Sequence, residues 1–129
     1  MIITKSRDYK DIVKNLKKSD KVSIISCNSC AKICGTGGEK NMEKMKSKLE
    51  KDGFKVVSLT LIAVPCNVDM VESSKKEVLG NKIVCIACDA AIHNLKKIFP
   101  KKKIIEALYT VGLGAFTDKG YISQVREFK

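Results

Sequence analysis

The sequence lacks tryptophan and any long hydrophobic run. No apolar stretch reaches the roughly 18 residues that a helix needs to span a bilayer, and residues 1–9 lack the apolar stretch of a secretory signal peptide. These absences predict a cytoplasmic protein without a membrane partner. The 129 residues, 44% of them hydrophobic, predict a single domain, 1–129, with a modest core.

Arginine and aromatic residues are also scarce. The net charge of +11, from 25 Lys and Arg against 14 Asp and Glu, raises the question of nucleic acid. However, only two of the cations are Arg, and no aromatic residue interleaves with the basic runs as a stacking platform. We therefore predict no nucleic-acid partner. For Lys101-Lys102-Lys103, a solvated turn and a dock for an acidic partner protein both stay open.

Common catalytic signatures are missing. No G-x-G-x-x-G directly follows a predicted strand, and there is no P-loop and no nucleophile elbow. Asp69 and Glu72 share one helical face, which is typical of ordinary helix surface. The single histidine, His93, is expected to be exposed or to cap a helix rather than to bind a metal. The residues thus point away from these kinds of enzyme.

What the sequence does contain is six cysteines with clustered spacing. Cys27, Cys30 and Cys34 form a C-x2-C-x3-C run that leads into the loop Gly35-Thr36-Gly37-Gly38. Thiolates select zinc or iron–sulfur centres over hard cations, and successive N–H groups in a glycine-rich loop stabilise negative charge. The clustering and the missing export signal favour a metal centre over disulfides. A phosphate in the glycine loop is an alternative on a weak motif.

Apolar runs alternate with helical patterns along the chain. Strands are predicted at 22–26, 54–59, 83–87 and 104–108. Helices are predicted after a Ser6 cap, from a Thr36/Glu39 capping box to Asp52, from an Asn67 cap through Leu79, and from an Asp89 cap up to Pro100. The glycine-rich tail predicts a hairpin. This order predicts an α/β fold, a small four-stranded, mostly parallel sheet with helices on both faces, flavodoxin-like or Rossmann-like.

Three cysteines each follow a different predicted strand: Cys27, Cys66 and Cys88. Open α/β sheets place ligands at that carboxyl edge, and helix N-termini there favour an anionic thiolate cluster. We predict a metal site with the ligands Cys27, Cys30, Cys34 and Cys66. Cys88 stays open between a ligand and a structural thiol, whereas Cys85, within a strand, is predicted to be a core residue.

Several segments together resemble one family. They are the run Cys27-x2-Cys30-x3-Cys34, Thr36-Gly37-Gly38-Glu39, Cys66, Ile86-Ala87-Cys88, and Ala107-Leu108-Tyr109-Thr110 leading to Gly114. Over roughly residues 20–122 they are similar to the MetV-type small iron–sulfur subunits of methylenetetrahydrofolate reductase, the methylenetetrahydrofolate reductase C-terminal-domain family. Typical members continue into a further cysteine-rich segment, which this sequence, ending at Lys129, does not include.

The resemblance implies a subunit that binds a [4Fe–4S] cluster beside a flavin-containing methylenetetrahydrofolate reductase in the one-carbon metabolism of anaerobes. Such a subunit passes electrons and does not itself catalyse the reduction. From the residues alone, the alternative is a structural zinc site in a protein-interaction module, held by the same four cysteines. Flavin or corrinoid binding at the same sheet edge rests on fold analogy alone.

Overall fold

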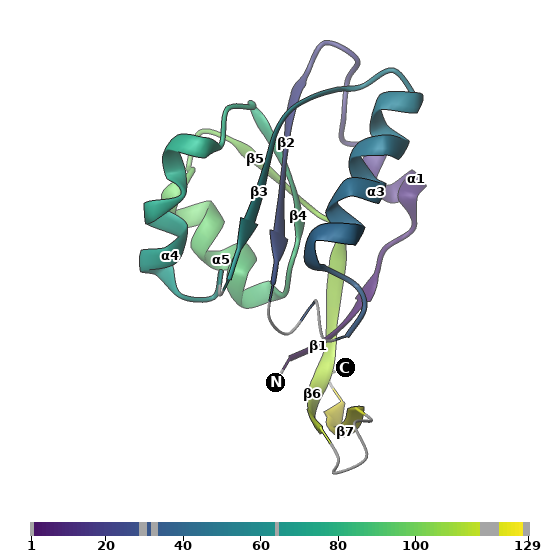
Figure 1. The fold of residues 1–129 in the computed structure, drawn as a ribbon, viewed down its shortest axis with the longest axis vertical. Coiled ribbons are helices and arrows are strands. Elements are labelled where there is room, and N and C mark those ends of the chain that lie inside the picture. The colour runs from purple at the N-terminus through teal and green to yellow at the C-terminus, as the bar shows by residue number, and fades with distance from the viewer. Residues whose placement is uncertain (1, 29–30, 32–33, 64, 117–121, 128–129) are drawn as a thin grey trace.

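The fold is seen in a computed structural model, which describes residues 2–28, 31, 34–63, 65–116 and 122–127. It is an α/β structure built on a four-stranded parallel sheet with helices on both faces (Figure 1). The strands, in the spatial order β3-β2-β4-β5, are β2 (Lys21–Cys27), β3 (Lys55–Ile62), β4 (Lys82–Ile86) and β5 (Lys103–Glu106). The predicted α/β class and four-stranded parallel sheet are thereby confirmed.

The helices divide between the two faces of this sheet. They are α1 (Tyr9–Val13), α3 (Gly38–Lys51), α4 (Val68–Ser73), α5 (Asp89–Ile98) and the 3-10 turn η1 (Lys75–Glu77). In Figure 1, α1 and α3 lie on one side of the sheet and α4 and α5 on the other. None of the helices among the described residues is long and apolar enough to cross a membrane.

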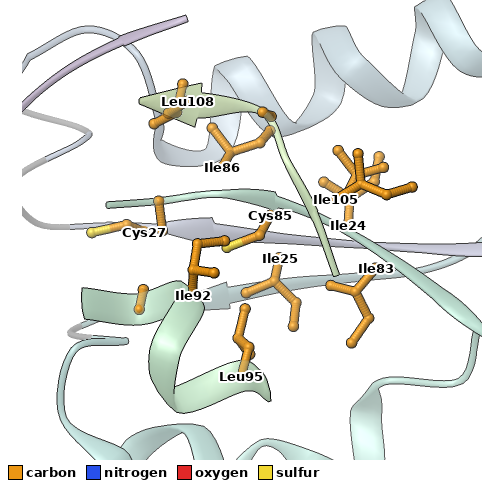
Figure 2. Packing of buried hydrophobic residues seen from close by; sticks show 14 of the residues in the cluster. Ile24, Ile25, Cys27, Ile83, Cys85, Ile86, Ile92, Leu95, Ile105 and Leu108 are labelled. Atoms are coloured by element: carbon orange, nitrogen blue, oxygen red, sulfur yellow. The ribbon is translucent and has the colours of Figure 1, made fainter. Parts of the chain in front are cut away.

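The two central strands form the middle of the core. All residues of β2 after Lys21 are buried, as are the last four of β4, which is typical of parallel strands covered on both faces. Figure 2 shows Ile25, Cys85 and Leu95 between the sheet and α5, with Ile24 and Ile105 on the opposite face. The alternation of side chains along each strand therefore feeds both layers of the core.

A second, antiparallel sheet adjoins the first. Its order is β1-β6-β7, formed by β1 (Ile2–Ser6), β6 (Leu108–Phe116) and β7 (Ile122–Glu127). The β6–β7 pair confirms the predicted hairpin in the tail, whereas β1 is absent from the sequence prediction. The predicted strand 104–108 is also wrong at its end, because β5 stops at Glu106 and Leu108 already pairs with Ser6 in the antiparallel sheet.

Four predicted helix boundaries differ from the structure. The N-cap residue of α5 is Cys88 and not the predicted Asp89, which is the first residue of the helix. Ser6 ends β1 and does not cap α1, whose N-cap residue is Asp8. Gly37 is the N-cap residue of α3 and makes no side-chain cap bond, so the capping box is wrong. The helix predicted through Leu79 stops at Ser73. There the hydroxyls of Ser73 and the next serine donate to the carbonyl of Met70, competing with the helical backbone bonds.

Candidate metal centre

The order of the parallel strands reverses between β2 and β4. From β2 the chain passes through α3 to β3 on one side, and then returns through α4 to β4 on the other side. Open α/β sheets bind their ligands outside the carboxyl ends of the strands at such a switch point. Cys27 is the last residue of β2, and Cys88 follows the end of β4 by two residues. Two cysteines therefore flank the switch point.

The three strand-end cysteines differ in exposure. Cys27 and Cys88 are only 5% and 7% exposed to solvent, whereas Cys66, which follows the edge strand β3, is exposed. All three follow adjacent parallel strands at the carboxyl edge, as their sequence positions predict. The two cysteines at the switch point are thus shielded from water, and the third faces solvent.

Cys85 lies in β4, fully buried. It pairs with Ile25 in β2, two residues before Cys27, so Cys85 and Cys27 share one face of the sheet; Figure 2 shows both on the α5 side. Burial first, and then electrostatic interaction with the side chains of Cys88, Cys27 and Glu106, raises the pKa of the Cys85 thiol. Cys85 is therefore a neutral core residue, in agreement with the sequence prediction.

The predicted ligand run extends beyond the described residues. Cys30 lies outside them, while Cys34 is half-buried in the turn before Gly35. Within the described ranges, no group of three or more His, Cys, Asp or Glu side chains is placed to hold a metal ion. The chemistry of the donors, thiols at a shielded sheet edge, suits a soft metal centre. The ligand set itself stays a prediction.

The loop that carries Cys66 is tied to two helices. The Asn94 side chain of α5 donates to the carbonyl oxygens of Pro65, at 3.2 Å, and Cys66, at 2.9 Å. The Asn67 side chain accepts from the backbone N–H of Asp69 at 3.0 Å, which confirms the predicted cap of α4. Sequence reasoning missed Asn94, because a polar residue on a helix gives no local sign of a partner 28 positions away.

The glycine loop is held by its own hydrogen bonds. The N–H groups of Thr36 and Gly37 donate to the carbonyl of Ala31 at 3.0 and 2.8 Å, and the N–H of Gly38 donates to Ser26 Oγ at 2.9 Å. Gly35 and Gly38 have positive φ angles of 75° and 84°, which favour glycine. Two of these donors tie the loop to Ala31, and the third ties it to Ser26 in β2. The role of the loop in binding a cofactor stays a prediction.

Gly37 packs directly against the cysteine run. A Cβ atom at this position would lie 2.7 Å from Ala31 Cβ and 3.1 Å from the carbonyl oxygen of Cys27. The neighbouring Asn28 has a buried Oδ1 without a hydrogen-bond partner among the residues described, an exception to the usual pairing of buried polar atoms. The loop and the start of the run therefore form one tightly packed unit.

Other sequence candidates lie away from this edge or at the surface. His93 is exposed on α5, as predicted, and Asp69 and Glu72 are exposed on α4. In the basic run, the Lys102 side chain donates to the carbonyl of Val78 at 2.8 Å. Lys102 thus stabilises the fold, and within the run only its neighbours Lys101 and Lys103 are exposed.

The structure defines an α/β protein with a parallel sheet whose switch point is flanked by two cysteines. Searches against protein-family models, curated proteins and solved structures find no match to the chain.

Proposed function

We propose that the chain binds a [4Fe–4S] cluster through Cys27, Cys30, Cys34 and a fourth cysteine, and that it is an electron-transfer or accessory subunit. The proposed partner is a flavin-dependent methylenetetrahydrofolate reductase or a related redox enzyme of anaerobic one-carbon metabolism. We also propose that the sheet is flavodoxin-like. If the four parallel strands are numbered in chain order, their spatial order in the sheet is 2-1-3-4. This order matches the start of the flavodoxin order.

The observation that carries the proposal is the position of Cys27 and Cys88. Cys27 ends one of the two neighbouring strands at the switch point, Cys88 follows the other by two residues, and both are more than nine-tenths buried. Shielding from solvent and hydrogen bonding to sulfur are the main means by which a protein tunes a thiolate-bound cluster. Two buried thiols at a ligand-binding edge are therefore better suited to such a centre than to catalysis on a soluble substrate.

The chain's own residues contribute in three ways. Cys88 is the N-cap residue of α5, where the partial positive charge at the N-terminus of a ten-residue helix would favour a negatively charged cluster. Asn94 ties the Cys66 loop to that same helix. The glycine loop packs against the carbonyl of Cys27 and would help to hold this first proposed ligand in place. When bound, the cluster would supply one-electron transfer.

The fourth ligand is a choice between Cys66 and Cys88. Cys66 is exposed on a tethered loop, whereas Cys88 is buried beside the strand that ends in Cys27. If Cys66 is the ligand, Cys88 remains a structural thiol near the centre. If Cys88 is the ligand, the exposed Cys66 lies at the surface where a partner protein would approach.

The test is the iron, acid-labile sulfide and zinc content of anaerobically purified protein, with visible absorption before and after dithionite. We expect about four iron and four sulfide per chain and a band that bleaches on reduction. Single Cys→Ser variants at Cys27, Cys30 and Cys34 should lose iron, and so should exactly one of Cys66→Ser and Cys88→Ser. The matched control is Cys85→Ala, which removes a buried thiol outside the proposed set.

One zinc per chain without colour, persisting after anaerobic reconstitution with iron and sulfide, would instead support the structural zinc module. Iron retained in the Cys27→Ser variant would contradict the proposed ligand set. Iron lost in Cys85→Ala, with the fold intact by circular dichroism, would contradict the assignment of Cys85 to the core.

A further inference from the structure

A cavity of about 130 Å³ lies between α1, α3 and the start of β6, apart from the strand-end cysteines. Its floor is apolar and buried, formed by Ile12, Ile86 and Leu108. Three exposed cations, Arg7, Lys44 and Lys48, also line it, and no Asp or Glu belongs to its lining among the described residues. The cavity therefore combines an apolar, buried floor with three exposed cations, which form its mouth.

Arg7 is held in place by the backbone of the neighbouring segment. Its N–H donates to the carbonyl of Ala107 at 2.8 Å, and its side-chain Nε donates to the carbonyl of Leu108 at 3.2 Å. The guanidinium also lies 5.7 Å from the centroid of the Tyr109 ring, within the range of a cation–π contact. The Nε bond uses one of the five N–H donors of the guanidinium. Arg7 is thus ordered while its terminal nitrogens still carry donors.

The opposite wall is ordered by Tyr9. Its hydroxyl donates to the carbonyl of Lys48 at 3.1 Å, and the Lys48 ammonium lies 5.8 Å from the centroid of its ring. Burial first, and then the Asp52 carboxylate at the end of α3, raise the pKa of Tyr9. The phenol is therefore neutral near pH 7 and adds no negative charge to the wall.

We propose that this cavity binds a small organic phosphomonoester, with the phosphate at the mouth and a compact apolar body on the floor. Three cations match a phosphate dianion better than a carboxylate with one charge, and the guanidinium fork fits phosphate oxygens in pairs. The volume is below the roughly 300 Å³ at which pockets for drug-sized ligands begin, which restricts the body to a few carbon atoms or one ring. No cysteine lines the cavity, but Thr36 of the glycine loop does, so the two proposals share one residue and are tested with different variants.

The test is isothermal titration calorimetry of the whole chain with phenyl phosphate, inorganic phosphate and benzoate at about 0.15 M salt. We expect saturable binding of phenyl phosphate, at least tenfold tighter than that of the other two. Absence of saturable heat with phenyl phosphate would overturn the proposal. Equal or tighter binding of inorganic phosphate would overturn the role of the apolar floor, and equal binding of benzoate would overturn selection of a dianion.

Variants locate the site. Arg7→Gln should weaken phenyl phosphate binding by about tenfold or more, since it removes charge-assisted hydrogen bonds to the phosphate. Lys44→Gln, at an exposed position on α3, should also weaken binding. Because this position is exposed, the variant still tests the site if Arg7→Gln fails to fold. The matched control is Lys97→Gln, an exposed lysine on α5 across the sheet. An equal loss in Lys97→Gln would show general charge attraction and overturn the site.

Discussion

Replacing Gly37 with alanine tests whether the glycine loop positions the cysteine run. The φ angle of Gly37 is −126°, which alanine adopts without strain, so the effect of the substitution is steric. The new Cβ would lie 2.7 Å from Ala31 Cβ, whereas carbon atoms in contact are about 3.5–4.0 Å apart. The loop and the segment after Cys27 must therefore separate by about 1 Å.

The cost of this separation follows from two opposing terms. Overpacking a tight site costs about 1–3 kcal/mol, and the stiffer unfolded chain of an alanine variant returns about 0.4–1 kcal/mol. We expect a net loss of about 1.3 kcal/mol in the free energy of unfolding, within a range of about 0–2.6 kcal/mol. Because the carbonyl of Cys27 is the second close contact, at 3.1 Å, the shift should also displace the first proposed ligand.

The assay combines urea unfolding with iron and sulfide content after anaerobic reconstitution. The matched control is Gly53→Ala, whose φ of +88° costs alanine about 1–2 kcal/mol but whose nearest contact is the flexible end of Lys18, at 3.5 Å. Both variants should be destabilised to a similar degree, and only Gly37→Ala should hold less iron. Equal iron in the two variants would refute the role of the loop, and wild-type stability in Gly37→Ala would refute the packing.

Three further predictions concern the scaffold. Asn67→Ala should lower the free energy of unfolding by about 1 kcal/mol in urea titrations, because it removes the α4 cap; no change would mean that the cap contributes nothing. Leu95→Ala, at a fully buried position on α5, should lower the free energy of unfolding by about 2–5 kcal/mol. A smaller loss would indicate that neighbouring core residues move to fill the cavity. The hydrogen bond from Lys82 is the main cause that lowers the Asp20 pKa to about 2. Since this folded-state pKa is below the unfolded value of about 3.9, the carboxylate stabilises the fold above pH 4 and ceases to do so as the pH falls to 2. The stability difference between wild type and Asp20→Asn should therefore shrink over that range, and a difference independent of pH would contradict the assignment.

Local patterns allowed much of the parallel sheet to be predicted. The apolar runs at 22–26 and 83–87 predict buried strands, and both runs are buried at the centre of the sheet. The end of α3 near Gly53 and the Asn67 cap of α4 were equally readable. The information in each case lies within a few residues, because a strand buried on both faces needs a continuous apolar run and a helix end needs a particular backbone or side chain.

Pairing between distant segments could not be predicted in this way. Strand β1 forms against β6, more than 100 positions along the chain, and this pairing ends β5 early. The hydroxyl of Thr36, predicted to cap α3, lies instead 2.7 Å from the hydroxyl of Thr4 in β1. A side chain with two suitable partners takes the one that the tertiary fold brings within reach, and the local sequence does not contain the distant partner.

The candidate sites divide along the same line. Local patterns suffice to predict that Cys27, Cys66 and Cys88 follow parallel strands, and hence that they share one edge, because parallel strands all end on the same side of a sheet. The strand order and packing are needed to show which two of them flank the switch point, that Cys66 is exposed, and that Arg7 and Lys44 line one cavity with an apolar floor. Strand order and helix packing bring these groups together, and both arise from burial of apolar surface across the whole chain rather than from any local motif.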